Sequence, residues 1–159
     1  MGAQWLYCLG GPLIILNPSG TTLYNQILAN GGVLKLTWSD PLGASANDYD
    51  IYVLNAGLTA VVASGTTIQN GTNDPMELIN GQAAGNRVVI FKKTGAAARA
   101  LHLNGFNQGT NGFTFTTQGQ TSGHSSAAAA FSVAATPAAA DGFGGPAGPY
   151  PSQFVTTNL

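Results

Sequence analysis

Alternating apolar and polar positions between residues 31 and 117 predict a series of short β-strands. At 33–38 the sequence VLKLTW places Leu34, Leu36 and Trp38 on one face of an extended chain, because successive side chains of a strand point to opposite faces. Similar segments occur at 50–54, 58–63, 76–79, 87–92, 100–103 and 112–116. We therefore predict an all-β fold, an antiparallel and jelly-roll-like β-sandwich of about seven strands.

The two flanks of this module differ from it in composition. Residues 1–30 open with an apolar run at 5–16, which is too short to span a bilayer and is interrupted by Gly10, Gly11 and Pro12. Residues 118–159 are rich in alanine, glycine and proline, which predicts an irregular segment. The chain is thus divided into an apolar lead segment at 1–30, a β-sandwich module at 31–117 and an irregular C-terminal segment at 118–159.

Charge contributes little to the surface of this protein. Only 7% of the residues are charged and the net charge is -1, so there is no field to attract phosphate backbones or anionic lipids. The polar positions carry mainly Asn, Thr, Ser and Gln, as is common in secreted and cell-surface β-proteins. The single cysteine, Cys8, excludes an internal disulfide and a cysteine-based zinc site. We expect a secreted, extracellular protein that binds no nucleic acid and spans no membrane.

Three carboxylates form the strongest candidate for a binding site. Asp40, Asp48 and Asp50 are half of the six acidic residues, and they lie in and beside one loop that also holds Ser45 and Asn47. Calcium takes six to eight oxygen ligands, which carboxylates and carbonyls at the edge of a sandwich provide. The alternative is that these residues form turns, in which their side chains cap backbone amides. The sequence therefore predicts either a calcium site or a set of turn caps.

Aromatic residues offer a second candidate surface. Trp38, Tyr49, Tyr52 and Phe91 are candidates for a platform that binds glycan or peptide. The alternation places Trp38 on the core face, which favours packing for that residue. His102 stands between two leucines, so the same alternation predicts it on the outer face of its strand.

Several motifs, taken in order, are similar to a known family. The sequences LTWSDP at 36–41, NDYDIYV at 47–53 and DPME at 74–77 resemble the pre-peptidase C-terminal-like β-sandwich, which is found beside or inserted within secreted bacterial peptidases. The sequence GHSSAAAAFSVAA at 123–135 looks like the segment with which subtilisin-like peptidases re-enter their parallel sheet. The resemblance covers roughly residues 20–155 as an ordered set of motifs. It implies an interior slice of a secreted subtilisin-like serine peptidase with its inserted sandwich.

The same resemblance implies a function. It makes 1–30 and 118–159 parts of a peptidase α/β domain, and 31–117 an inserted module. The family's catalytic Asp, His and Ser motifs match no position here, so we expect neither enzymatic activity nor catalytic residues. The implied role is a non-catalytic accessory module that stabilises the host peptidase catalytic domain or positions a protein or peptide substrate. The alternatives are a self-assembling structural protein and a carbohydrate- or collagen-binding module.

Overall fold

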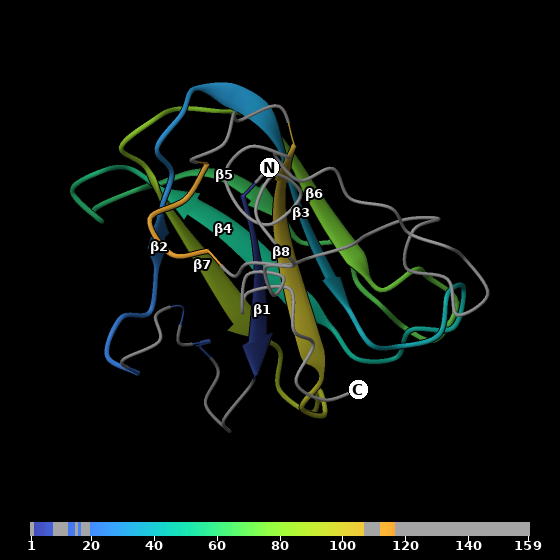
Figure 1. Cartoon of the computed structure of the whole chain (residues 1–159). Helices are drawn as coiled ribbons and strands as arrows, with labels where there is room; N and C mark the ends of the chain where they lie inside the picture. The colour runs from blue at the N-terminus through green and yellow to red at the C-terminus, as the bar shows by residue number, and fades with distance from the viewer. Residues whose placement is uncertain (1, 8–12, 15, 17–19, 107–111, 117–159) are drawn as a thin grey trace, which may run out of the picture. The chain divides into compact units, whose positions relative to one another are not determined.

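Two antiparallel β-sheets make up the part of the chain that the structure describes. This computed structural model describes residues 2–7, 13, 14, 16, 20–106 and 112–116. Eight strands occur there, namely β1 (Gly2–Tyr7), β2 (Asn25–Gln26), β3 (Gly31–Trp38), β4 (Tyr49–Leu54), β5 (Val61–Gly65), β6 (Met76–Gln82), β7 (Arg87–Lys92) and β8 (Ala100–Phe106). They form the sheets β1-β8-β3-β6 and β2-β7-β4-β5 (Figure 1). The predicted all-β class is confirmed.

The strands of the first half of the chain pair with those of the second half in reverse order. β1 pairs with β8, β2 with β7, β3 with β6 and β4 with β5. The pairings of β3 with β8 and of β4 with β7 complete the two sheets. The pairing is therefore nested, with the first and last strands paired to each other and the two middle strands paired to each other. Within the described residues, no helix is long and apolar enough to cross a membrane.

The limits of the sheets differ from the predicted ones. β1 and β2 lie before residue 31, so the sheets begin earlier than the predicted module. The segment 112–116 was predicted as a strand, but it forms only an isolated bridge between Phe113 and Ile27. Phe113 is buried in the core at this bridge, 2% exposed. The predicted irregular segment at 118–159 lies outside the described residues.

Alternate residues of both sheets meet in one apolar core. In β3 the predicted core residues Leu34, Leu36 and Trp38 are buried. Strands β4, β6, β7 and β8 add further residues to that core, namely Tyr49, Ile51, Val53, Ile79, Val88, Ile90, Leu101 and Leu103. Each fully buried side chain of this size contributes about 1.5–3 kcal/mol relative to an exposed one. This shared core joins the two sheets in a β-sandwich-like arrangement.

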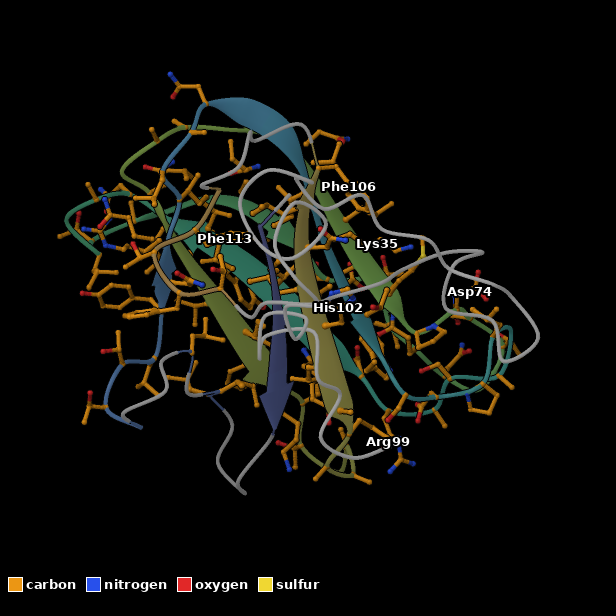
Figure 2. The ribbon with its side chains drawn as sticks, viewed as in Figure 1. Lys35, Asp74, Arg99, His102, Phe106 and Phe113 are labelled. Atoms are coloured by element: carbon orange, nitrogen blue, oxygen red, sulfur yellow. The ribbon has the colours of Figure 1, made fainter. Side chains whose placement is uncertain are left out.

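His102 lies on β8, in the interior of its sheet between β1 and β3 (Figure 2). It alternates with the core residues Leu101 and Leu103, which places it on the outer face as predicted. It is nevertheless only 9% exposed. Because strands flank β8 on both sides, its outer face is less open than that of an edge strand.

Candidate functional site

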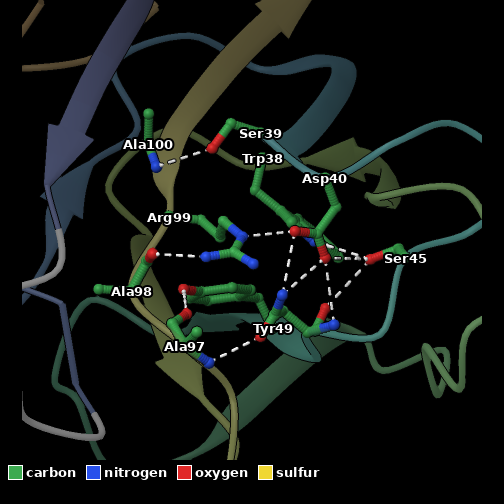
Figure 3. Close-up of polar contacts among 10 residues, drawn as sticks. Trp38, Ser39, Asp40, Ser45, Tyr49, Ala97, Ala98, Arg99 and Ala100 are labelled. Atoms are coloured by element: carbon green, nitrogen blue, oxygen red, sulfur yellow. Dashed lines mark hydrogen bonds and ion pairs between the residues drawn. The ribbon is translucent and has the colours of Figure 1, made fainter.

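Asp40 is the centre of a hydrogen-bond network at one end of the sandwich (Figure 3). Its carboxylate accepts hydrogen bonds from Arg99 Nε at 2.5 Å and from Ser45 Oγ at 2.9 Å. Asn47 donates to it through its backbone nitrogen at 3.1 Å and through its side-chain amide at 3.0 Å. Trp38 Nε1 in turn donates to Ser45 Oγ at 3.0 Å. The network therefore links the end of β3, the following loop and the start of β8.

The charge of Asp40 is stabilised within this network. Burial raises the pKa of the carboxyl, but the hydrogen bonds from Arg99, Asn47 and Ser45 outweigh that effect and lower the pKa to about 2. The side chain is only 3% exposed, and Arg99 is its ion-pair partner. Both oxygens are occupied by donors from the protein itself. Asp40 thus caps the backbone amide of Asn47, which is the alternative to calcium binding that the sequence predicts.

Asp50 and Asp48 lie apart from that network. Asp50 accepts a hydrogen bond from the Tyr52 hydroxyl at 2.8 Å and pairs with Lys93 at 3.3 Å. Burial and the neighbouring charge of Asp50 raise the pKa of Asp48, whose carboxylate accepts a hydrogen bond from the backbone of Gln69. Asp48 Oδ1 is buried without a partner in the described structure.

The structure thus does not bring the three predicted calcium ligands together around one point. Within the ranges that the structure describes, no group of three or more acidic, histidine or cysteine side chains is arranged to hold a metal ion. Asp40 and Asp50 each have partners from the protein itself, Arg99 for Asp40 and Tyr52 and Lys93 for Asp50. Calcium binding at Asp40, Asp48 and Asp50 stays a prediction.

The four candidate aromatic residues do not form one platform. Trp38 and Tyr49 are buried in the core, 5% and 0% exposed, with ring centroids 5.2 Å apart. The Tyr49 hydroxyl donates to Ala97 O at 2.6 Å, which satisfies its polar end. Tyr52 is partly exposed on the opposite face of β4. The prediction of one aromatic surface made of all four residues is therefore wrong, because Tyr49 and Tyr52 lie on opposite faces of β4.

An open apolar groove lies on the outer face of the sheet β2-β7-β4-β5. We call it the outer groove; its walls include Leu23, Tyr52, Leu54, Leu58, Val61 and Val89. Its volume of about 780 Å³ falls in the range of roughly 300–1,000 Å³ that is usual for ligand sites. The outer face of a sandwich is normally polar. Here β4 and β7 present apolar side chains on both faces, and the outward set forms the groove.

Two features fix the shape of the outer groove. The hydrogen bond from Tyr52 to Asp50 holds the ring and raises the pKa of Tyr52 to about 12, so the hydroxyl stays protonated at neutral pH. Leu58 adopts a left-handed conformation with φ of 58° in the hairpin between β4 and β5, which costs an L-residue roughly 1–2 kcal/mol. This strained leucine is 44% exposed and lines the groove. Strain of this kind tends to accumulate at functional positions.

The walls of the outer groove are mainly apolar, which suits the binding of an apolar ligand. No serine, cysteine, histidine or charged residue is among the described residues that line it. The sequence pattern predicts an apolar face for 33–38, but it does not predict a groove of outward apolar side chains on β4 and β7. The available signal was the segment YDIYVL at 49–54, in which Tyr52 and Leu54 continue the apolar character on the second face.

Comparison of the chain with protein-family models, with curated proteins and with solved structures gives no match in any of the three.

Proposed function

We propose that this chain is a non-catalytic accessory module of a secreted subtilisin-like peptidase, and that it binds an apolar protein segment in the outer groove. The observation that supports this proposal is the groove itself. It is an uncharged, partly exposed apolar surface on a face that a free-standing sandwich covers with polar side chains. The partner is the host catalytic domain or a protein substrate, and in either case a polypeptide segment would occupy the groove.

The chemistry of the groove defines the segment that fits it. Leu23, Leu58 and Val61 are 42%, 44% and 57% exposed, so each has apolar surface left to bury. Burial of such surface contributes about 25 cal/mol per Å², from which the loss of freedom on association is subtracted. A short peptide with leucine or phenylalanine side chains should therefore bind with micromolar to millimolar affinity, of the order of 4–8 kcal/mol.

Titration of the ¹⁵N-labelled chain tests this proposal. The probe is a short uncharged peptide that contains leucine and phenylalanine, and the control is a serine–glycine peptide of equal length. We expect saturable shifts of the amide signals of Tyr52, Leu58 and Val61 with the apolar peptide only. Shifts with both peptides, or with neither, would refute the groove as the binding site.

Self-association is a second candidate function, supported by the exposed edge strand β5. This strand contains no charged residue and no proline, although such residues commonly protect sheet edges. Val61 and Val62 on it are 57% and 53% exposed. The register shift opposite Val53 and Leu54 bends this strand, which limits pairing along its length. Light scattering over a concentration series distinguishes the candidates, since a mass that stays monomeric contradicts self-association.

A further inference from the structure

A second pocket lies where the edge strands of the two sheets meet. Strand β5 is the edge of one sheet and β6 the edge of the other. The pocket between them has a volume of about 370 Å³ and includes Ser64, Thr66, Thr67, Met76, Glu77 and Leu78 in its walls. We refer to it as the Glu77 pocket. It shares no residue with the outer groove.

Glu77 is the only ionisable residue among the described walls of this pocket. Glu77 is buried, 3% exposed, and Gln69 Nε2 donates a hydrogen bond to Glu77 Oε1 at 3.0 Å. The backbone and the hydroxyl of Thr67 also donate to the carboxyl. All of these donors are neutral. The ion pairs of the described chain join Lys93 to Asp50 and Arg99 to Asp40, and neither involves Glu77.

Because Gly65 has no side chain, there is room beside it for the carboxylate of Glu77. A Cβ atom at position 65 would lie 2.8 Å from Glu77 Oε2 and 3.1 Å from Ile51 Cγ2. The backbone of Gly65 is not in the left-handed region, so the conformation of the strand does not explain a glycine there. The missing side chain is explained by the close approach of Glu77.

A buried carboxylate without a cation is costly unless a positive charge reaches it. Burial accordingly raises the pKa of Glu77, and the negative charge of Asp50 adds to the same effect. A cation in the pocket would offset both contributions, because an opposite charge favours the ionised carboxylate. The site is therefore electrostatically complementary to a positively charged group.

The walls of the pocket indicate which cation fits. Ser64 and Thr66 add hydroxyl oxygens that accept hydrogen bonds from an ammonium group. Met76 and Leu78 are apolar neighbours. The methylene stem of a lysine can lie along them while its ammonium group forms hydrogen bonds. Calcium takes six to eight oxygen ligands, and the described walls contain a single carboxylate. We propose that the Glu77 pocket binds a lysine side chain of a partner protein.

Titration with two matched small molecules tests this assignment. N-acetyl-lysine amide is the probe, and N-acetyl-norleucine amide is the control with a similar stem and no charge. The lysine compound is expected to shift the amide signals of Ser64, Thr67 and Glu77 in a saturable way, and the norleucine compound is not. Glu77→Gln keeps an acceptor for Gln69 and should weaken lysine binding roughly tenfold or more. Val61→Asp, in the outer groove, should leave it unchanged.

Three outcomes would overturn the proposal. The first is an equal response to the norleucine compound, and the second is unchanged affinity in Glu77→Gln. The third is the same pattern of shifts with sodium or calcium chloride at matched ionic strength, which would assign the pocket to an inorganic cation. If Glu77→Gln does not fold, Thr66→Val is the second variant. Thr66 is exposed, and unchanged lysine affinity in Thr66→Val would contradict its role as an acceptor.

Discussion

Replacement of Asp40 by asparagine tests the hydrogen-bond network at the end of the sandwich. The pKa of Asp40 falls from 3.8 to about 2 in the folded chain, and each pKa unit corresponds to about 1.4 kcal/mol. Asp40→Asn keeps the size of the side chain but removes the charge that pairs with Arg99. We therefore expect a loss of about 2 kcal/mol in the free energy of unfolding at neutral pH. Urea denaturation measures it directly.

The pH dependence of this loss follows from the direction of the pKa shift. Because the folded pKa lies below the unfolded value, the stabilisation is fully present above about pH 4 and disappears as the pH falls through about 2. The difference between the native chain and Asp40→Asn should narrow over that window. Asp74→Asn is the control, since exposed Asp74 accepts one hydrogen bond, from Gly43 N at 2.8 Å, and should cost only about 0.5–1 kcal/mol. A loss below about 0.5 kcal/mol for Asp40→Asn, or one that does not change with pH, would refute the reasoning.

Three further predictions concern Gly65, Glu77 and calcium. Gly65→Ala should destabilise the fold by about 1–3 kcal/mol, because the added Cβ would lie 2.8 Å from Glu77 Oε2. Gly57→Ala is the control. Its added Cβ would meet no atom closer than 3.8 Å, so it should leave the free energy of unfolding unchanged in the same urea assay. Burial raises the pKa of Glu77, so the free energy of unfolding should decrease as the pH rises through that pKa. Glu77→Gln should lack this decrease, and an equally steep fall of stability with pH in the variant would contradict the prediction. A calcium site at Asp40, Asp48 and Asp50 predicts a higher melting midpoint with calcium than with chelator, and equal midpoints would remove that site.

The sequence pattern predicted the core of the sandwich but not its edges. The period-two alternation in 33–38 identified Leu34, Leu36 and Trp38 correctly because one face of β3 is buried. The strand β2 has only two residues, too few for any periodicity. The segment at 112–116 has the composition of a strand, yet only Phe113 is paired. Strand pairing depends on distant partners, and a local pattern does not contain them.

The candidate sites were harder to predict for a different reason. Asp40, Asp48 and Asp50 are close in sequence, but two of them form ion pairs with different partners, Asp40 with Arg99 and Asp50 with Lys93. Arg99 is 59 positions from Asp40, a separation that sequence spacing does not reveal. The outer groove is assembled from the segment before β2, the hairpin after β4 and strand β7. Only the fold brings these segments together.

The most direct test of the outer groove compares two neighbouring valines on β5. Val61 lines the groove and Val62 does not, and their exposed fractions are similar at 57% and 53%. Val61→Asp should weaken binding of the leucine–phenylalanine peptide at least tenfold, about 1.4 kcal/mol, because it places a charge on an apolar wall. Val62→Asp should bind the peptide as the native chain does. Equal affinities for the two variants would contradict a binding site in the outer groove.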